Sequence, residues 1–106
     1  MLLAFSDGCC GKIDLQQQQG LFIIQAEKVN GNCYYLNEEG EWGPRGIWMC
    51  GDSWWIGELS DKGQCKGWYH ASTDSKPNVR VQDDSLQWKF NDSDFDLKFN
   101  CVDLCL

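Results

Sequence analysis

The sequence predicts an all-β fold, a small antiparallel sandwich or barrel of about seven short strands stapled by disulfides. Short apolar runs alternate with polar residues and are separated by eleven glycines and scattered Asn and Asp, which is the spacing typical of a small β domain. No stretch repeats apolar residues with the period of an amphipathic helix. Seven cysteines without a CxxC pair favour disulfides over a zinc site.

The first predicted hairpin follows a short strand at residues 12–15. Residues 22–29 and 32–36 flank Asn30-Gly31, a pair that tolerates the positive φ angles of a type I′ turn. In that register Lys28 faces Cys33 and Ala26 faces Tyr35. The face expected to point into the core then carries Phe22, Ile24, Ala26, Cys33 and Tyr35.

A second hairpin is predicted from residues 46–50 and 53–58, because Gly51-Asp52 suits a type II′ turn. In this register Met49 faces Trp54 and Trp48 faces Trp55. Further strands are expected at residues 65–70, 79–81, 86–90 and 95–102, the last of which has the cleanest alternation of apolar and polar residues. We expect this last strand to lie beside the first one.

The cysteine positions predict which parts of the chain are joined. Pairing of the last strand with the first brings Cys9 or Cys10 to Cys101, and we expect the bond Cys10–Cys101. Cys33 and Cys50 form a possible second pair if residues 40–45 are a plain connection. Reduced thiols and a metal site remain alternatives. Because seven is odd, one thiol is free or bonds another chain, with Cys9 and Cys105 as candidates.

Length and charge narrow the class of protein. The 106 residues fit a single domain over residues 1–106, with residues 1–8 as a flexible N-terminal segment. The net charge is −7 and the basic residues are scattered singly, so we expect no nucleic-acid partner. The apolar run at residues 1–5 is shorter than a signal-peptide core or a membrane span, so we expect no membrane insertion.

No catalytic centre is predicted. His70 is the only histidine, and neither a nucleophile elbow nor a phosphate-binding loop is present. We therefore expect a protein that is not an enzyme and needs no cofactor. Asp92, Asp94 and Asp96 resemble the start of a calcium loop but lack its central Gly and distal Glu, so a solvated acidic face is the default and calcium a weak alternative. Asn91 begins the one N-glycosylation sequon.

Tryptophan is the best functional hint. Neighbouring residues such as Trp54 and Trp55 point to opposite faces of a strand, so one can enter the core while the other reaches the surface. Exposed aromatic rings stack on sugars or anchor protein partners. The alternative is that both faces of the sheet are covered. The candidate binding aromatics are Trp42, Trp54, Trp55, Trp68 and Tyr69.

One set of residues carries a resemblance. The string consists of Val29-Asn30-Gly31, Tyr34-Tyr35, Trp54-Trp55-Ile56-Gly57, Gly67-Trp68-Tyr69, Trp88 and Cys101. It resembles a small Trp- and Gly-rich, Cys-terminated β-module that recurs in extracellular proteins of invertebrates and protists. The resemblance covers about residues 9–102 and implies secretion and a role other than catalysis. Cys33, Cys50 and Cys65 are extra to the pattern, so it implies nothing about the internal disulfides.

Together these observations predict a secreted binding or structural module. The first hypothesis is protein–protein interaction or extracellular assembly, including self-association. The second is a carbohydrate-binding, lectin-like module that uses surface Trp. The third is a secreted toxin or defence protein, against which the net charge of −7 argues.

Overall fold

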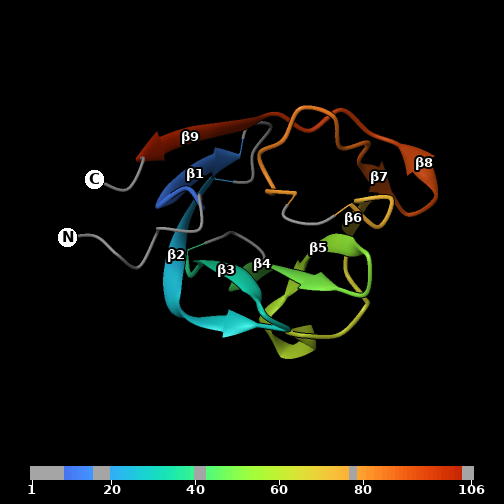
Figure 1. The fold of residues 1–106 in the computed structure, drawn as a ribbon. Coiled ribbons are helices and arrows are strands. Elements are labelled where there is room, and N and C mark those ends of the chain that lie inside the picture. Colours follow the sequence, from blue (N-terminus) through green and yellow to red (C-terminus); the bar gives the residue numbers. More distant parts are fainter. Residues whose placement is uncertain (1–8, 16–19, 40–42, 77–78, 104–106) are drawn as a thin grey trace.

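The computed structural model describes residues 9–15, 20–39, 43–76 and 79–103. These residues form an all-β fold in which one antiparallel sheet curls into a half-barrel (Figure 1). The strand order is β8-β7-β6-β5-β4-β3-β2-β1-β9. The sheet is thus neither a sandwich nor a closed barrel, and it has nine strands rather than about seven. The strand that the sequence did not predict is Ser93–Asp94, which forms a hairpin with Lys89–Phe90.

The strands are short except for the second. Their bounds are β1 (Lys12–Leu15), β2 (Gly20–Val29), β3 (Asn32–Asn37), β4 (Arg45–Cys50), β5 (Ser53–Glu58), β6 (Tyr69–Ser72), β7 (Lys89–Phe90), β8 (Ser93–Asp94) and β9 (Phe99–Asp103). One 3-10 turn, η2 (Leu59–Asp61), follows β5. Residues 79–81 form no strand, and β6 begins at Tyr69 rather than at residue 65.

The hairpin of β2 and β3 has the predicted turn. Asn30 and Gly31 both have positive φ, 53° and 80°, and Lys28 lies opposite Cys33. The predicted pairing of Ala26 with Tyr35 is wrong, because the register shifts within β2 and Ile24 lies opposite Tyr35. A bulge of this kind bends a strand and increases its twist, which contributes to the curl of the sheet.

The hairpin of β4 and β5 has the predicted register throughout. Met49 lies opposite Trp54 and Trp48 opposite Trp55. Gly51 has φ +65°, whereas Asp52 does not have positive φ, as a type II′ turn requires. The two-residue turns therefore set the register of all of β4–β5 and of the part of β2–β3 that lies next to its turn.

The last strand lies beside the first, as predicted. β1 pairs with β2 on one side and with β9 on the other, and Ile13 lies opposite Cys101. Cys10 is bonded to Cys101. The half-barrel thus ends at β9 on one side and at β8 on the other, and the chain from residue 95 to residue 98 runs directly between these two edges (Figure 1).

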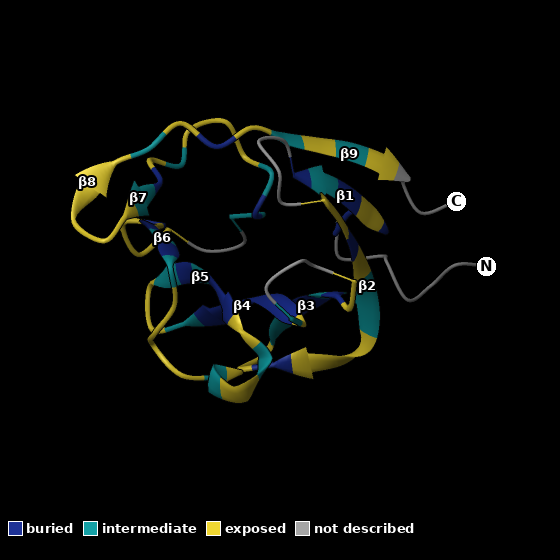
Figure 2. Cartoon of the chain, turned by 180° about the vertical axis from the view of Figure 1, so that it is seen from behind, coloured by how far each residue is buried: buried dark blue, intermediate teal, exposed yellow. Residues whose placement is uncertain are grey.

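Most residues of the central strands are buried (Figure 2), and their side chains form two clusters. The larger cluster fills the inside of the half-barrel and includes Ile13, Phe22, Tyr35, Ile47, Trp54 and Ile56. The smaller cluster packs on the opposite face of the sheet around Val29, Tyr34 and Trp48. Neighbouring residues such as Tyr34 and Tyr35 join different clusters because strand side chains alternate between faces.

The two remaining disulfides differ from the expected pair. Cys33 is bonded to Cys9 and Cys50 to Cys65, so the prediction of a Cys33–Cys50 bond is wrong, as is that of Cys9 as the odd thiol. Continuing the observed register of β3 and β4 places Cys33 opposite Met49, not Cys50. A one-residue offset sends the two side chains to opposite faces.

Candidate functional site

A groove lies between two segments that contain little regular structure. One segment is residues 82–88, which precede β7, and the other is residues 94–99, which connect β8 to β9. We call it the acidic groove; its volume is about 570 Å³. It is lined by Gln82, Asp83, Asp84, Leu86, Gln87, Trp88, Asp94, Phe95, Asp96, Leu97, Lys98 and Phe99.

Backbone hydrogen bonds and aromatic contacts hold the two segments together. The amide of Phe95 donates to the carbonyl of Trp88 at 2.9 Å. The rings of Trp88 and Phe99 lie 5.1 Å apart, and the ring of Phe95 stacks on Tyr69 at 5.3 Å. Because Trp88, Tyr69 and Leu97 are buried, these contacts tie the apolar part of the groove to the core of the half-barrel.

One wall of the acidic groove is a hydrogen-bonded turn. The amide of Leu86 donates to the carbonyl of Asp83 at 3.2 Å. The Asp83 carboxylate accepts hydrogen bonds from the amide and hydroxyl of Ser85 at 2.8 and 2.7 Å. These hydrogen bonds lower the pKa of Asp83, since they favour its charged form. Asp83 is therefore a carboxylate over the whole neutral range.

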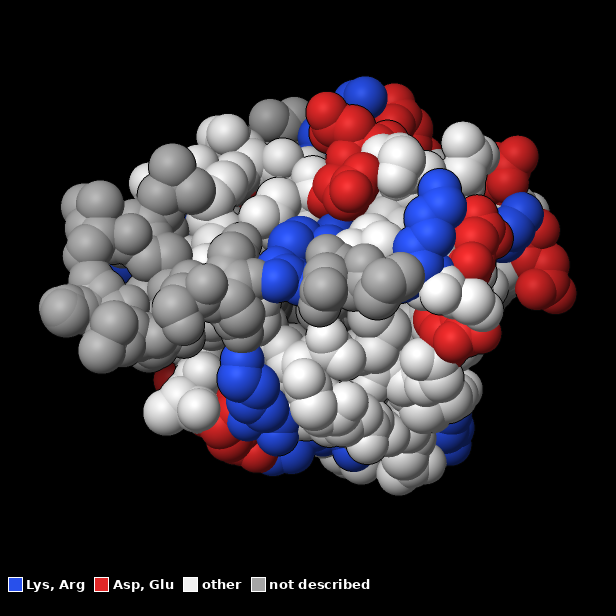
Figure 3. Space-filling model, viewed as in Figure 1, with Lys and Arg blue, Asp and Glu red and all other residues white. Residues whose placement is uncertain are grey.

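The groove carries a net negative charge. Its lining contains four aspartates and one lysine, which gives −3. Asp94 pairs with Lys89 at 2.9 Å and Asp96 with Lys98 at 3.3 Å, and all four of these side chains are well exposed. Figure 3 shows acidic side chains gathered over the loop before β7 and over the β7–β8 hairpin, with lysines among them.

One buried acceptor in the groove is not satisfied. The side-chain oxygen Oε1 of Gln82 is buried and has no hydrogen-bond partner among the described residues. Leaving a buried acceptor without a donor costs about 1–3 kcal/mol. Because the protein encloses this oxygen, a ligand in the groove does not reach it without a movement of the Gln82 side chain.

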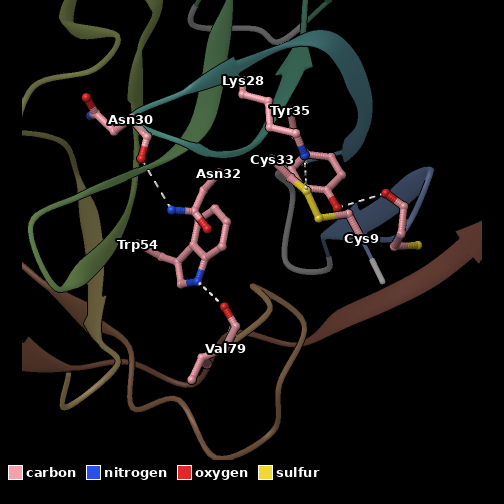
Figure 4. The surroundings of a disulfide bond; sticks show 9 residues. Cys9, Lys28, Asn30, Asn32, Cys33, Tyr35, Trp54 and Val79 are labelled. Atoms are coloured by element: carbon pink, nitrogen blue, oxygen red, sulfur yellow. Dashed lines mark hydrogen bonds between the residues drawn. A yellow bond between two sulfur atoms is a disulfide. The ribbon is translucent and has the colours of Figure 1, made fainter. Parts of the chain in front are cut away.

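Two of the candidate binding aromatics, Trp54 and Tyr69, are buried. Trp54 is only 1% exposed, and its indole N–H donates to the carbonyl of Val79 at 3.0 Å (Figure 4). Tyr69 lies between Phe90 and Phe95. Both residues point to the inside of the half-barrel because of their register on β5 and β6.

The other two described aromatic candidates are half-buried and lie apart from each other. Trp55 stacks on His70 at 4.8 Å and packs against the smaller cluster. Trp68 packs against the larger cluster, with the guanidinium carbon of Arg45 5.8 Å from its ring centre. They do not form one continuous aromatic surface. Trp42 lies outside the described residues.

The structure places the remaining candidates as follows. Asn91 is exposed in the turn between β7 and β8, with φ 55°. Asp94 and Asp96 pair with lysines, and among the described residues no three His, Cys, Asp or Glu side chains are grouped to hold a metal ion. Asp92 is exposed in the turn. The single histidine, His70, stacks on Trp55.

The comparisons with known proteins give no family. No family model, curated protein or solved structure matches this chain at a significant level. Within the described part of the chain, no helix is long and apolar enough to span a membrane.

Sequence reasoning missed the acidic groove. It treated Asp92, Asp94 and Asp96 as one strand face and did not connect them with Gln82, Asp83 and Asp84. The available signal was the density of aspartates on both sides of Trp88 and Phe90. Pairing of the two segments across the groove depends on the β7–β8 hairpin, whose strands are two residues long and leave no periodic pattern.

Proposed function

We propose that this chain is a secreted, disulfide-stapled module without catalytic activity that binds a protein partner through the acidic groove. The supporting observation is the combination of half-buried aromatic rings and carboxylates around one opening of about 570 Å³. Ligand sites are commonly concave, largely apolar and marked by a few polar groups.

The scaffold suits binding because buried residues anchor both sides of the groove to the core. Cys10–Cys101 ties β9 to the N-terminal part of the described chain, and Trp88 and Leu97 anchor both groove segments in the core. A preformed site loses less conformational entropy on binding than a mobile loop does. The groove is thus suited to hold a partner segment without rearranging.

A protein partner is favoured over a glycan. Flat exposed rings are what stack on sugars, yet Trp54 is buried and Trp55 and Trp68 lie apart and half-buried. The groove instead presents charged side chains around a narrow apolar floor. That combination matches the side chains and backbone of a peptide segment.

Secretion is supported by the covalent chemistry. Three disulfides form and persist in oxidising compartments such as the secretory pathway and the cell exterior. Asn91 is exposed, so its sequon is accessible for glycosylation. Both features favour an extracellular partner.

Cross-linking to extracellular proteins tests the proposal. The tagged protein is cross-linked to the secreted and surface proteins of the producing cells, and partners are identified by mass spectrometry. We expect Asp84→Arg to lose a specific partner and Glu39→Arg to keep it. Both variants change the charge equally at exposed positions, but only Asp84 lines the groove. Equal capture by the two variants would contradict the proposal, as would groove-dependent binding to a glycan array.

A further inference from the structure

We infer that Asn91 carries an N-linked glycan in the secreted protein, and that the first sugar of this glycan packs on the exposed ring of Phe90. The inference rests on the secretion that is part of the proposed function, because N-glycans are added in the secretory pathway. It goes beyond that function by giving the glycan a structural role in the hairpin of β7 and β8.

The fold presents the sequon at a turn on the edge of the sheet. Asn91-Asp92-Ser93 is the one N-glycosylation sequon of the sequence, and all three residues are exposed. Its first two residues connect β7 to β8. The strand order places no other strand of the described chain beyond β8 (Figure 1), so this edge of the sheet leaves room for a bulky glycan.

The side chain of Asn91 is available for the bond to the sugar. Its amide makes no hydrogen bond within the described part of the chain. By contrast, the amide of Asn30, in the turn between β2 and β3, donates to the carbonyls of Met49 and Gly63 at 2.8 and 3.1 Å. The backbone of Asn91 is held separately, because its N–H donates to the carbonyl of Trp68 at 3.4 Å. Attachment of a sugar to Nδ2 therefore breaks no contact of the turn.

The ring of Phe90 supplies the surface that the sugar covers. This side chain is 41% exposed, and covering an apolar ring removes it from water, which is favourable. The rings of Tyr69 and Phe95 lie 5.1 and 6.1 Å from it. Phe90 is thus held in place by the rings beside it while a large part of its own ring faces solvent.

The first sugar is within reach of this ring. Phe90 and Asn91 are neighbours in the chain, so their Cα atoms are about 3.8 Å apart, and the short Asn side chain keeps the sugar close to the backbone. A pyranose ring has an apolar face of C–H groups, and the negative face of an aromatic ring attracts such hydrogens. The contact therefore joins the turn, through Phe90, to the packed rings of Tyr69 and Phe95.

The hairpin that this contact stabilises is a weak part of the fold. β7 and β8 contain two residues each, and a short hairpin is marginally stable on its own. β8 ends at Asp94 and is followed by Phe95, and both residues line the acidic groove. The glycan thus stabilises one side of that groove.

Mass spectrometry of the protein from the medium of the producing cells tests the modification. We expect the peptide that contains Asn91 to carry an N-glycan, and peptide N-glycosidase to release the glycan and leave an aspartate. Ser93→Ala should abolish the glycan and Ser93→Thr should keep it. An unmodified Asn91 in the secreted protein would overturn this inference and leave the proposed function intact. Absence of the protein from the medium would contradict the secretion on which both rest.

Two enzymes test the contact with Phe90. An endoglycosidase leaves a single N-acetylglucosamine on Asn91, whereas peptide N-glycosidase removes the whole glycan. We expect the single-sugar form to melt at least about 3 °C higher, which is the effect of a weak aromatic contact in a domain of this size. The ring current of Phe90 should also shift sugar proton resonances upfield. Phe90→Leu should lower both melting temperatures and abolish the difference between them. A difference that persists in Phe90→Leu would contradict the contact.

A new sequon at Asp74 is the matched control. Asp74 is exposed and has the same φ as Asn91, 55°, but the residue before it is Thr73 and carries no ring. In a chain with Asp74→Asn, Lys76→Thr and Ser93→Ala, the two enzymes should leave proteins whose melting temperatures agree within about 1 °C, because the sugar has no adjacent ring to cover. A gain as large as that at Asn91 would show that the sugar stabilises without stacking and would overturn the proposed contact.

Discussion

Cys10 is bonded to Cys101, 91 residues further along the sequence. The bond lies beside the pairing of β1 with β9, where Ile13 faces Cys101. It therefore joins one edge strand of the half-barrel to the N-terminal part of the described chain. The other edge, β8, is connected to β9 by the segment that lines the acidic groove, so this bond also supports the groove.

Removal of Cys10–Cys101 should destabilise the protein more than removal of Cys50–Cys65. In the chain-entropy model a loop of 91 residues contributes about 4.6 kcal/mol, and one of 15 residues about 3 kcal/mol. Urea unfolding of the double variants Cys10→Ala/Cys101→Ala and Cys50→Ala/Cys65→Ala measures the two losses. Alanine is used because Cys10 is fully buried. A serine hydroxyl at this position would be removed from water, which costs free energy in itself. The reverse order of the two losses would contradict the prediction.

The three disulfides of the described residues leave Cys105 as the remaining cysteine. Six of the seven cysteines are paired, and Cys105 lies outside the described residues. Peptide mapping without reduction should find the three bonds and one remaining cysteine. Cys105→Ser should abolish any covalent dimer and change the free energy of unfolding by less than about 0.5 kcal/mol. A changed disulfide pattern in Cys105→Ser would contradict the assignment.

The strand pairings that the sequence predicts correctly are those next to residues with a clear turn preference. Asn30-Gly31 and Gly51-Asp52 each determine a turn type, and the turn type sets the register of the strands beside it. The pairing of β9 with β1 followed from alternation in the last strand and from the cysteines near both ends of the chain. These are all features that a short stretch of sequence can express.

Features that depend on a register shift or on a returning loop were not predictable. The segment of β2 that contains the bulge has no Gly or Pro, so the sequence does not indicate the bulge. The regular register predicts that Ala26 faces the core, whereas Ala26 is exposed. The expected Cys33–Cys50 bond is not formed because the register of β3 and β4 differs by one residue from the one it requires. One of the two alternatives for the outer face of β4 and β5 was exposure to solvent. Instead, the segment after β5 folds back towards β4, and its Cys65 is bonded to Cys50. The acidic groove is built from non-periodic segments, whose sequence does not express their pairing.

Gly57→Ala should destabilise the protein by about 1–3 kcal/mol, the cost of overpacking. A Cβ at Gly57 would lie 2.8 Å from the Cα of Gly67, where the returning loop crosses β5. That loop covers Trp48, whose indole N–H donates to the carbonyl of Gln64 at 2.7 Å. We therefore expect a red shift of tryptophan emission together with a lower urea midpoint. Gly31→Asn is the comparison, because a Cβ there meets nothing within 4 Å and the variant carries only the backbone strain of a side chain at φ +80°, which is smallest for Asn, so it should lose less stability. Equal losses in the two variants would argue against the loop contact.

Stability should fall as the pH rises through the titration of Tyr34. This residue is 2% exposed, and burial, with help from the charges of Glu27 and Glu38, raises its pKa from 10.0 to about 12. Above pH 10 the unfolded chain loses the Tyr34 proton while the folded chain keeps it, so the unfolded state binds fewer protons and the free energy of unfolding decreases with pH. The contribution is fully present below pH 10 and is lost between pH 10 and about 12.

Tyr34→Phe isolates this contribution. Burial also raises the pKa of Tyr69, so the variant should keep part of the alkaline loss of stability and lack the part that belongs to Tyr34. Urea unfolding at pH 8, 10 and 11 gives the slope of the free energy of unfolding against pH for each protein. The phenolate absorbance of the folded protein shows whether the variant has one tyrosine fewer with a raised pKa. Because base-catalysed disulfide exchange affects both proteins alike, the difference between their slopes reports Tyr34. The same slope for wild type and Tyr34→Phe would show that the phenol ionises equally in the folded and unfolded chains, and that the smaller cluster does not shield it.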